Sequence, residues 1–82
     1  MKSKYVKIYD DILNKIENNI YKFGDSLPSE SDLMKEYEAS RDTIRKSLNM
    51  LVTNGYITKA RGKLATVNDI HKLKFPIAKI TS

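Results

Sequence analysis

Cationic and hydroxyl side chains are concentrated in one short segment near the middle of the chain. The segment holds Ser40, Arg41, Thr43, Arg45 and Lys46. An arginine can donate to both acceptors on the edge of a guanine, and a hydroxyl can reach a base or a phosphate. Backbone N–H groups at the start of a helix also bind phosphate. If a helix begins here, these residues are candidates for contacts with nucleic acid.

A second cationic segment follows at residues 59–63. It consists of Lys59, Arg61 and Lys63 around Gly62, which has no side chain. A flat tip flanked by cations can approach a narrow minor groove closely, and Lys59 would lie near a phosphate. The alternative, that these are the charges of an ordinary solvated hairpin, stays open at this point.

The residue types that catalysis requires are scarce in this sequence. The chain has no Cys and a single His, His71, so neither a cysteine nucleophile nor a Cys/His metal cluster can be built. Ser40 has no His nearby in the sequence, and the three glycines do not form a phosphate-cradling loop. We therefore expect a protein that is not an enzyme and that holds no metal or cofactor.

Positive charge is concentrated in the second half of the chain. Residues 1–40 carry a net charge of −2 and residues 41–82 carry +7, within a total of +5 over 82 residues. This asymmetry is typical of a surface that meets a polyanion, although a solvated basic surface with a basic tail has the same composition. No apolar run has the length of a membrane span or resembles a secretory signal, so we expect a cytoplasmic protein without a membrane partner.

The spacing of apolar residues predicts a first helix over about residues 5–20. Its apolar stripe includes Ile8, Ile12, Ile16 and Ile20, which recur every three or four residues. Such a stripe packs against the rest of a small core, so all four isoleucines are expected to be buried.

Two serines are placed to cap two further helices. Ser29 predicts a helix over residues 30–37, and Ser40 predicts one over residues 41–53, which Gly55 terminates. The buried face of the third helix is expected to contain four residues, Ile44, Leu48, Leu51 and Val52.

A β-hairpin is predicted to follow the third helix. Its strands span residues 56–60 and 64–67, with a turn at residues 61–63. The order helix, helix, tight turn, helix, hairpin predicts a mainly α fold with a small β-hairpin, a winged helix-turn-helix. In such a fold the third helix enters the major groove of double-stranded DNA with its N-terminal end first.

The chain is predicted to contain one domain and a tail. The domain spans residues 1–69, and residues 70–82, which include Pro76 and show no periodicity, form a linker toward a C-terminal domain outside this sequence.

Four motifs resemble the N-terminal domain of GntR-family bacterial transcription regulators. They are Leu27–Glu30, Ala39–Arg45, Leu51–Ile57 and Arg61–Lys63. The resemblance covers about residues 5–68. It implies a winged helix-turn-helix that binds double-stranded DNA sequence-specifically and serves as a repressor.

The resemblance implies roles for individual residues. Arg41 and Arg45 occupy positions that contact guanines and phosphates, and Thr43 occupies a base or phosphate contact. Ser29 would donate to a phosphate, and Lys4, before the first helix, would touch another.

The chain departs from the family pattern at three places. Ser31 stands where many relatives have a basic residue, and Glu38 stands where the family prefers Gly. If the backbone at Glu38 is left-handed, Glu costs roughly 1 kcal/mol more than Gly. Gly62 matches the glycine of the wing tip, which enters the minor groove, but residues 63–65 differ from the usual wing sequence and should make the wing stiffer.

The tail resembles the HutC-like branch of the family, in particular repressors of trehalose operons. The residues concerned are Phe75–Ile77 and Thr81–Ser82. This resemblance implies a homodimer on a palindromic operator. It also implies a small-molecule effector, trehalose 6-phosphate, bound by the C-terminal domain.

Two other functions deserve a test against the same residues. A winged helix that docks proteins would need apolar anchors on the outer face of its third helix, where this chain has polar and charged residues instead. RNA binding commonly uses exposed aromatic side chains on a sheet. The tyrosines at positions 5, 9, 37 and 56 are instead expected in the core or at its edge, which counts against their use as platforms for stacked bases.

Overall fold

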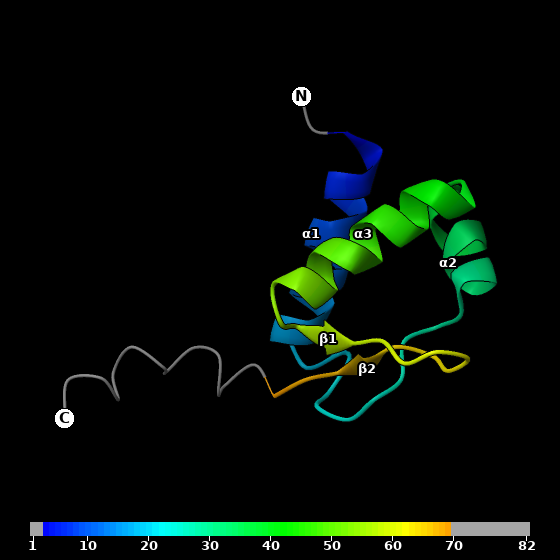
Figure 1. Cartoon of the computed structure of the whole chain (residues 1–82). Helices are drawn as coiled ribbons and strands as arrows, with labels where there is room; N and C mark the ends of the chain where they lie inside the picture. Colours follow the sequence, from blue (N-terminus) through cyan, green and yellow to red (C-terminus); the bar gives the residue numbers. More distant parts are fainter. Residues whose placement is uncertain (1–2, 70–82) are drawn as a thin grey trace, which may run out of the picture.

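The fold is a winged helix-turn-helix, as the sequence predicts. The computed structural model describes residues 3–69. Its elements are α1 (Lys4–Glu17), α2 (Glu30–Tyr37), α3 (Arg41–Thr53), β1 (Ile57–Thr58) and β2 (Thr66–Val67). α3 crosses α1, α2 lies at the N-terminal end of α3, and the hairpin lies below α3 (Figure 1). The predicted linker, residues 70–82, lies outside the described residues.

α1 buries three of the four isoleucines that its periodicity picked out. Ile8, Ile12 and Ile16 are buried, but Ile20 is 63% exposed, so the prediction for Ile20 was wrong. The helix ends at Glu17, three residues earlier than predicted, because the backbone at Asn19 turns left-handed (φ 63°). Residues beyond that turn no longer follow the helical period.

α2 and α3 begin at the serines that the sequence identified as caps. The Ser29 hydroxyl accepts a hydrogen bond from the Asp32 N–H at 3.1 Å. The Ser40 hydroxyl accepts one from the Thr43 N–H at 3.3 Å. Each cap satisfies a backbone donor that the helix itself leaves free.

The buried face of α3 differs from the predicted face at one residue. Val52 is 38% exposed, whereas Ser47 is fully buried. The Ser47 hydroxyl donates to the Tyr5 carbonyl of α1 at 2.7 Å. A hydroxyl that finds such a partner can be buried at little cost, and its small size lets the two helices approach each other.

The hairpin is shorter than predicted and has an additional neighbour. Ile57 pairs with Val67 and Thr58 with Thr66, in antiparallel order, so the predicted strands 56–60 and 64–67 were too long. The chain leaves the ladder after Thr58 and forms a loop over residues 59–65, which we call the wing. β2 also pairs on its other side with the segment before α2, where the Leu27 N–H donates to the Ala65 carbonyl at 2.8 Å.

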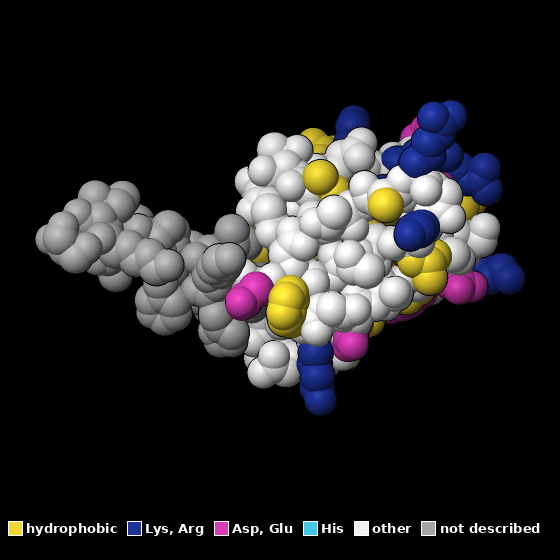
Figure 2. Space-filling view, turned by 60° about the horizontal axis from the view of Figure 1, so that its bottom comes forward, with side chains coloured by type: hydrophobic (Ala, Val, Ile, Leu, Met, Phe, Trp, Pro, Cys, Tyr) yellow, Lys and Arg dark blue, Asp and Glu magenta, His cyan; other side chains and the backbone are white. Residues whose placement is uncertain are grey.

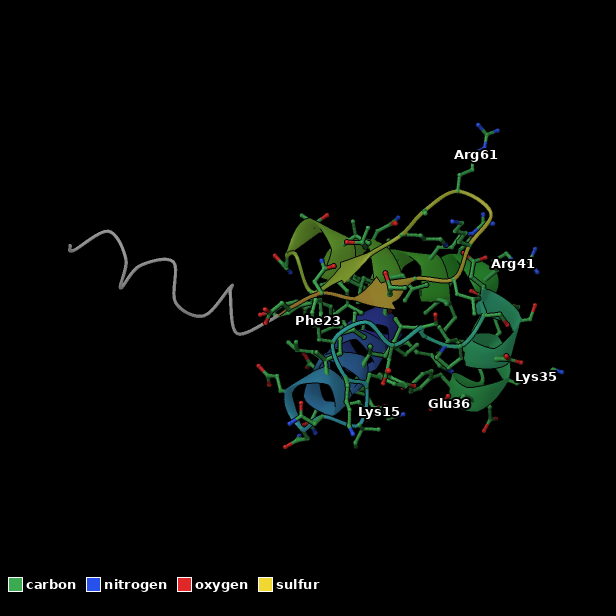
Figure 3. All side chains as sticks on the ribbon, turned by 90° about the horizontal axis from the view of Figure 1, so that it is seen from below. Lys15, Phe23, Lys35, Glu36, Arg41 and Arg61 are labelled. Atoms are coloured by element: carbon green, nitrogen blue, oxygen red, sulfur yellow. The ribbon has the colours of Figure 1, made fainter. Side chains whose placement is uncertain are left out.

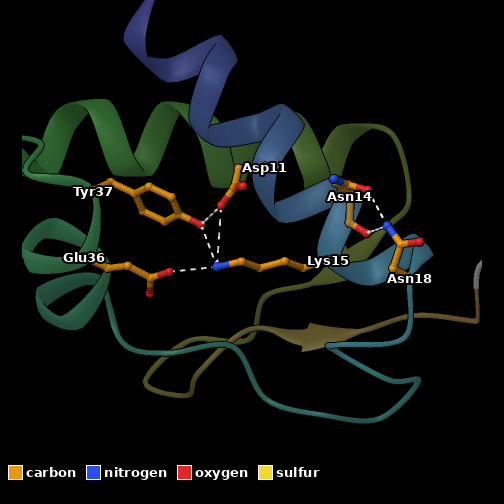
Figure 4. A network of polar contacts seen from close by, with 6 residues as sticks. All are labelled: Asp11, Asn14, Lys15, Asn18, Glu36 and Tyr37. Atoms are coloured by element: carbon orange, nitrogen blue, oxygen red, sulfur yellow. Dashed lines mark hydrogen bonds and ion pairs between the residues drawn. The ribbon is translucent and has the colours of Figure 1, made fainter.

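A polar network joins α1 to α2 (Figure 4). The Tyr37 hydroxyl donates to Asp11 at 2.6 Å, and Lys15 donates to Glu36 at 2.8 Å. Burial raises the pKa of Tyr37, and the bond to Asp11 raises it further. Tyr9, Tyr37 and Tyr56 pack at the edge of the core, as predicted. The polar network therefore fixes α2 against α1 and involves only the side of α2 that faces α1.

Within residues 3–69, no helix has both the length and the apolar character that a membrane span requires.

Candidate nucleic-acid interface

A groove lies between the start of α2, the first half of α3 and the wing. Its volume is about 490 Å³, and we call it the wing groove. Six of the predicted contact residues line it, Ser29, Arg41, Arg45, Lys59, Gly62 and Lys63. The structure thus brings the cationic segments 40–46 and 59–63 to one surface.

Glu30 holds the three walls of the wing groove together. Its carboxylate accepts hydrogen bonds from Arg45 Nε at 3.2 Å and from Lys59 Nζ at 2.8 Å. The bond from Lys59, and next that from Arg45, lowers the pKa of the Glu30 carboxyl below its ordinary value. Glu30 therefore stays ionised and fixes α3 and the wing relative to α2.

The remaining cations of the groove are unpaired within residues 3–69. Arg41 and Lys63 form no ion pair with a described residue, and neither does Arg61 at the tip of the wing. Arg61 projects from the wing, and Arg41 projects from the start of α3 (Figure 3). Most of the Lys and Arg side chains visible in Figure 2 gather at this end of the molecule. Such charges are free to meet a polyanion.

The wing turns at Gly62, which has a left-handed backbone (φ 73°). An added Cβ at this position would have no heavy atom within 4 Å, so the space beside Gly62 is open. The Lys63 N–H donates to the Ala60 carbonyl at 3.1 Å and closes the turn. The expected turn at residues 61–63 is therefore present.

Five predicted contact residues do not line the wing groove, and one of them is Arg61 at the tip of the wing. Lys4 is the first residue of α1 rather than preceding it, and its amine donates to the Glu38 carbonyl between α2 and α3. The Lys46 amine lies 4.8 Å from the centre of the Tyr5 ring. Ser40 and Thr43 share a hydrogen bond of 2.9 Å between their hydroxyls at the start of α3.

Ser31 and Leu64 are among the lining residues of the wing groove that the sequence did not single out as contacts. Ser31 lines the groove from α2, and the half-exposed Leu64 lines it from the wing. Ser31 is the second residue after the cap of α2, so the predicted helix start was a signal for it. Nothing in the local sequence of Leu64 indicates its position, because the wing rejoins the strand ladder only at Thr66.

Comparisons with known sequences agree on one family. Residues 4–67 match the family described as "Bacterial regulatory proteins, gntR family". The chain is 44% identical over 80 residues to the HTH-type transcriptional regulator TreR of Bacillus subtilis (strain 168), covering 98% of this chain and 34% of TreR. It is 35% identical over 79 residues to the arabinose metabolism transcriptional repressor of Halalkalibacterium halodurans, covering 96% of this chain and 21% of that repressor. The chain thus spans about a third or less of these relatives.

Solved structures show the same fold. The AraR DNA-binding domain in complex with operator ORE1 has a TM-score of 0.80 at 30% identity, and 82% of each chain is covered. A GntR family transcriptional regulator from Listeria monocytogenes has a TM-score of 0.82 at 28% identity, covering 98% of this chain and 74% of that one.

Three helices, a short hairpin and a cationic groove between them define a winged helix-turn-helix DNA-binding domain. The chain belongs to the gntR family of bacterial regulatory proteins.

Proposed function

We propose that residues 3–69 bind double-stranded DNA sequence-specifically, as the DNA-binding domain of a bacterial transcriptional repressor. One observation carries this proposal: Arg41, a cation of α3 without an ion pair in residues 3–69, lines the same groove as Gly62 and Lys63 of the wing tip. A winged helix with this geometry can engage a major groove and the neighbouring minor groove together.

In this proposal the start of α3 enters the major groove. Arg41 is exposed and unpaired within residues 3–69, so it can bond to a guanine edge or a phosphate. Arg45 uses Nε for Glu30, which leaves its two terminal nitrogens for a base or a phosphate. Thr43, Ser40 and the N–H groups at the start of α3 contact the backbone nearby.

The wing enters the minor groove and contacts the backbone beside it. Gly62 lets the tip approach closely, and Arg61 and Lys63 supply charge on either side of it. Lys59, Ser29 and Lys4 contact phosphates, while Lys46 extends the charge along α3. Cation contacts with phosphate position the domain, whereas α3 reads the bases.

The whole protein would be a homodimer on a palindromic operator, with residues 1–69 as the DNA-binding domain and residues 70–82 as a linker. A C-terminal domain would bind a small-molecule effector, trehalose 6-phosphate, a proposal that depends on the resemblance of residues 75–82 to trehalose-operon repressors. A protein of this function acts on chromosomal DNA in the cytoplasm and catalyses no reaction.

Arg41→Ala tests the proposed function directly. The variant is preferred to Arg45→Ala because Arg45 also bonds to Glu30, so its loss would disturb the groove itself. A preferred duplex is first selected from a random library with the unmodified chain. Arg41→Ala should weaken binding to that duplex by roughly 1–3 kcal/mol and relax its base preference.

Lys22→Ala is the matched control. Lys22 is exposed and lines neither the wing groove nor the α2 groove, the hollow on the outer face of α2. Within residues 3–69 it bonds to Asp25 through its backbone N–H and carbonyl, and its amine forms no ion pair. The control should bind like the unmodified chain. Unchanged affinity and unchanged base preference in Arg41→Ala, measured by fluorescence anisotropy, would contradict the proposal.

A further inference from the structure

A second groove, of about 510 Å³, lies on the outer face of α2. We call it the α2 groove. Its lining residues are Ser31, Met34, Lys35, Glu38, Ala39 and Arg41. Ser31 and Arg41 line both grooves, so the wing groove continues onto the outer face of α2.

We infer that Lys35, beside Arg41, holds a phosphate of the DNA backbone in the α2 groove. This inference rests on the proposed function and extends its interface past α3 to a residue that sequence reasoning did not select. The ligand is a backbone phosphate, so the contact adds affinity on every sequence alike.

The position of Lys35 on α2 supports this contact. Ser31 and Lys35 are four residues apart and so share one face of α2, and Glu38 follows the end of the helix beside them in the groove lining. Leu33 is fully buried and anchors the helix to the core. Lys35 and Arg41 both project from the end of the molecule formed by α2 and the start of α3 (Figure 3).

The charges around Lys35 leave its amine available. Lys35 is exposed and forms no ion pair with any residue in the described part of the chain. The adjacent Glu36 is held by Lys15 at 2.8 Å. Lys15 itself is thereby occupied on the α1 side of α2. Lys35 is thus the free cation that α2 offers on its outer face.

Glu38 is the opposing charge in the α2 groove, because its carboxylate would repel a phosphate. Lys35 and Arg41 outnumber it, so the groove keeps a net positive charge. The apolar part of the lining, Met34 and Ala39, suits the aliphatic stem of a lysine whose amine remains in water.

The test measures how binding to a short duplex of mixed sequence depends on salt. Each phosphate contact contributes about 0.9 to the slope of log K against log salt concentration. Lys35→Ala should lower that slope by about this amount. The advantage of the unmodified chain over the variant should then shrink about 3-fold when salt rises fourfold.

Three further variants isolate the charge of Lys35. Lys35→Arg should keep the slope, because it keeps a cation at this position. Glu38→Gln should strengthen binding, because it removes the opposing charge. Lys22→Ala should leave the slope unchanged, since Lys22 lies outside both grooves. Circular dichroism checks that each variant is folded, and Ala at an exposed helical site favours folding.

The outcomes separate this inference from the proposed function. If the unmodified chain binds DNA and Lys35→Ala keeps the full slope, the inference is wrong and the proposed function stands. If Lys35→Ala loses affinity for only some sequences, Lys35 contacts a base, and the phosphate assignment is equally overturned. If no duplex binds the unmodified chain, the proposed function itself fails.

Discussion

At the scale of single residues, Glu30 has two tasks in this molecule. As the first residue of α2, directly after the cap, it places a negative charge at the positive end of the helix dipole. Its carboxylate also bonds to Arg45 of α3 and to Lys59 of the wing. The same residue therefore stabilises its own helix and sets the spacing of the groove walls.

Glu30→Gln should destabilise the fold near neutral pH by about 1 kcal/mol or less, because both ion pairs are partly solvated. The folded-state pKa of Glu30 lies below its ordinary value of 4.5. The Glu30 carboxylate therefore stabilises the fold at pH values above 4.5, and this stabilisation is lost as the pH falls through the lower folded-state pKa. Urea unfolding at a series of pH values measures the difference in the free energy of unfolding between Glu30→Gln and the unmodified chain.

That difference should shrink toward zero on acidification. A difference that stays constant across the acidic range would mean that the carboxylate charge of Glu30 contributes nothing to stability. Since Gln keeps the size and the hydrogen-bonding capacity of the side chain, the comparison isolates the charge.

At the scale of elements, the turn between α2 and α3 contains a residue with an unfavourable backbone conformation. Glu38 has a left-handed backbone (φ 52°). In this conformation Glu is expected to cost roughly 1 kcal/mol more than Gly. The Ala39 N–H donates to the Met34 carbonyl at 3.0 Å and closes the end of α2. The turn thus reaches its usual geometry without the glycine that best fits it.

Glu38→Gly should stabilise the domain by roughly 1 kcal/mol, because glycine has no Cβ to clash in the left-handed region. The urea midpoint measures the gain. Glu38→Ala is the matched control, since it removes the same charge but keeps a Cβ, and it should give no such gain. Equal effects of the two substitutions would assign the change to charge rather than to the backbone.

At the scale of the whole molecule, the proposed DNA surface occupies one end of a small scaffold. α1 braces α3 through Ser47 and braces α2 through the Lys15 and Tyr37 network. The scaffold therefore holds the wing groove in place without contributing much surface to it. One such domain offers few contacts, so tight binding requires two domains on a two-fold site.

Two copies of the chain joined by a flexible linker should bind a duplex with two inverted half-sites about 10²-fold or more tightly than a duplex with one. The half-sites should lie about one helical turn apart, and moving one by half a turn should reduce the gain, because the linker must then reach around the duplex. Fluorescence anisotropy measures the affinity for the three duplexes, which carry one half-site, two half-sites in phase, and two half-sites half a turn out of phase. Equal affinity for one and two half-sites would contradict the palindromic operator.

Features that depend on neighbouring residues could be predicted from the sequence alone. The caps Ser29 and Ser40 satisfy N–H groups only three residues away, and the turn at Gly62 needs only its own backbone freedom. The bounds of α2 and α3 and the order of elements follow from such local signals and from helical periodicity. The positions of the cations on α3 were predictable for the same reason.

Features that depend on distant segments were decided only by the tertiary structure. Ile20 is exposed because α1 ends before it, and Ser47 is buried because the Tyr5 carbonyl of α1 meets it there. Glu30 meets Arg45 and Lys59, which are 15 and 29 residues away along the chain. Side-chain type and helical period select which residues can bear charge or be buried. Packing between elements then selects which of them meet, because contact energies depend on distances in space.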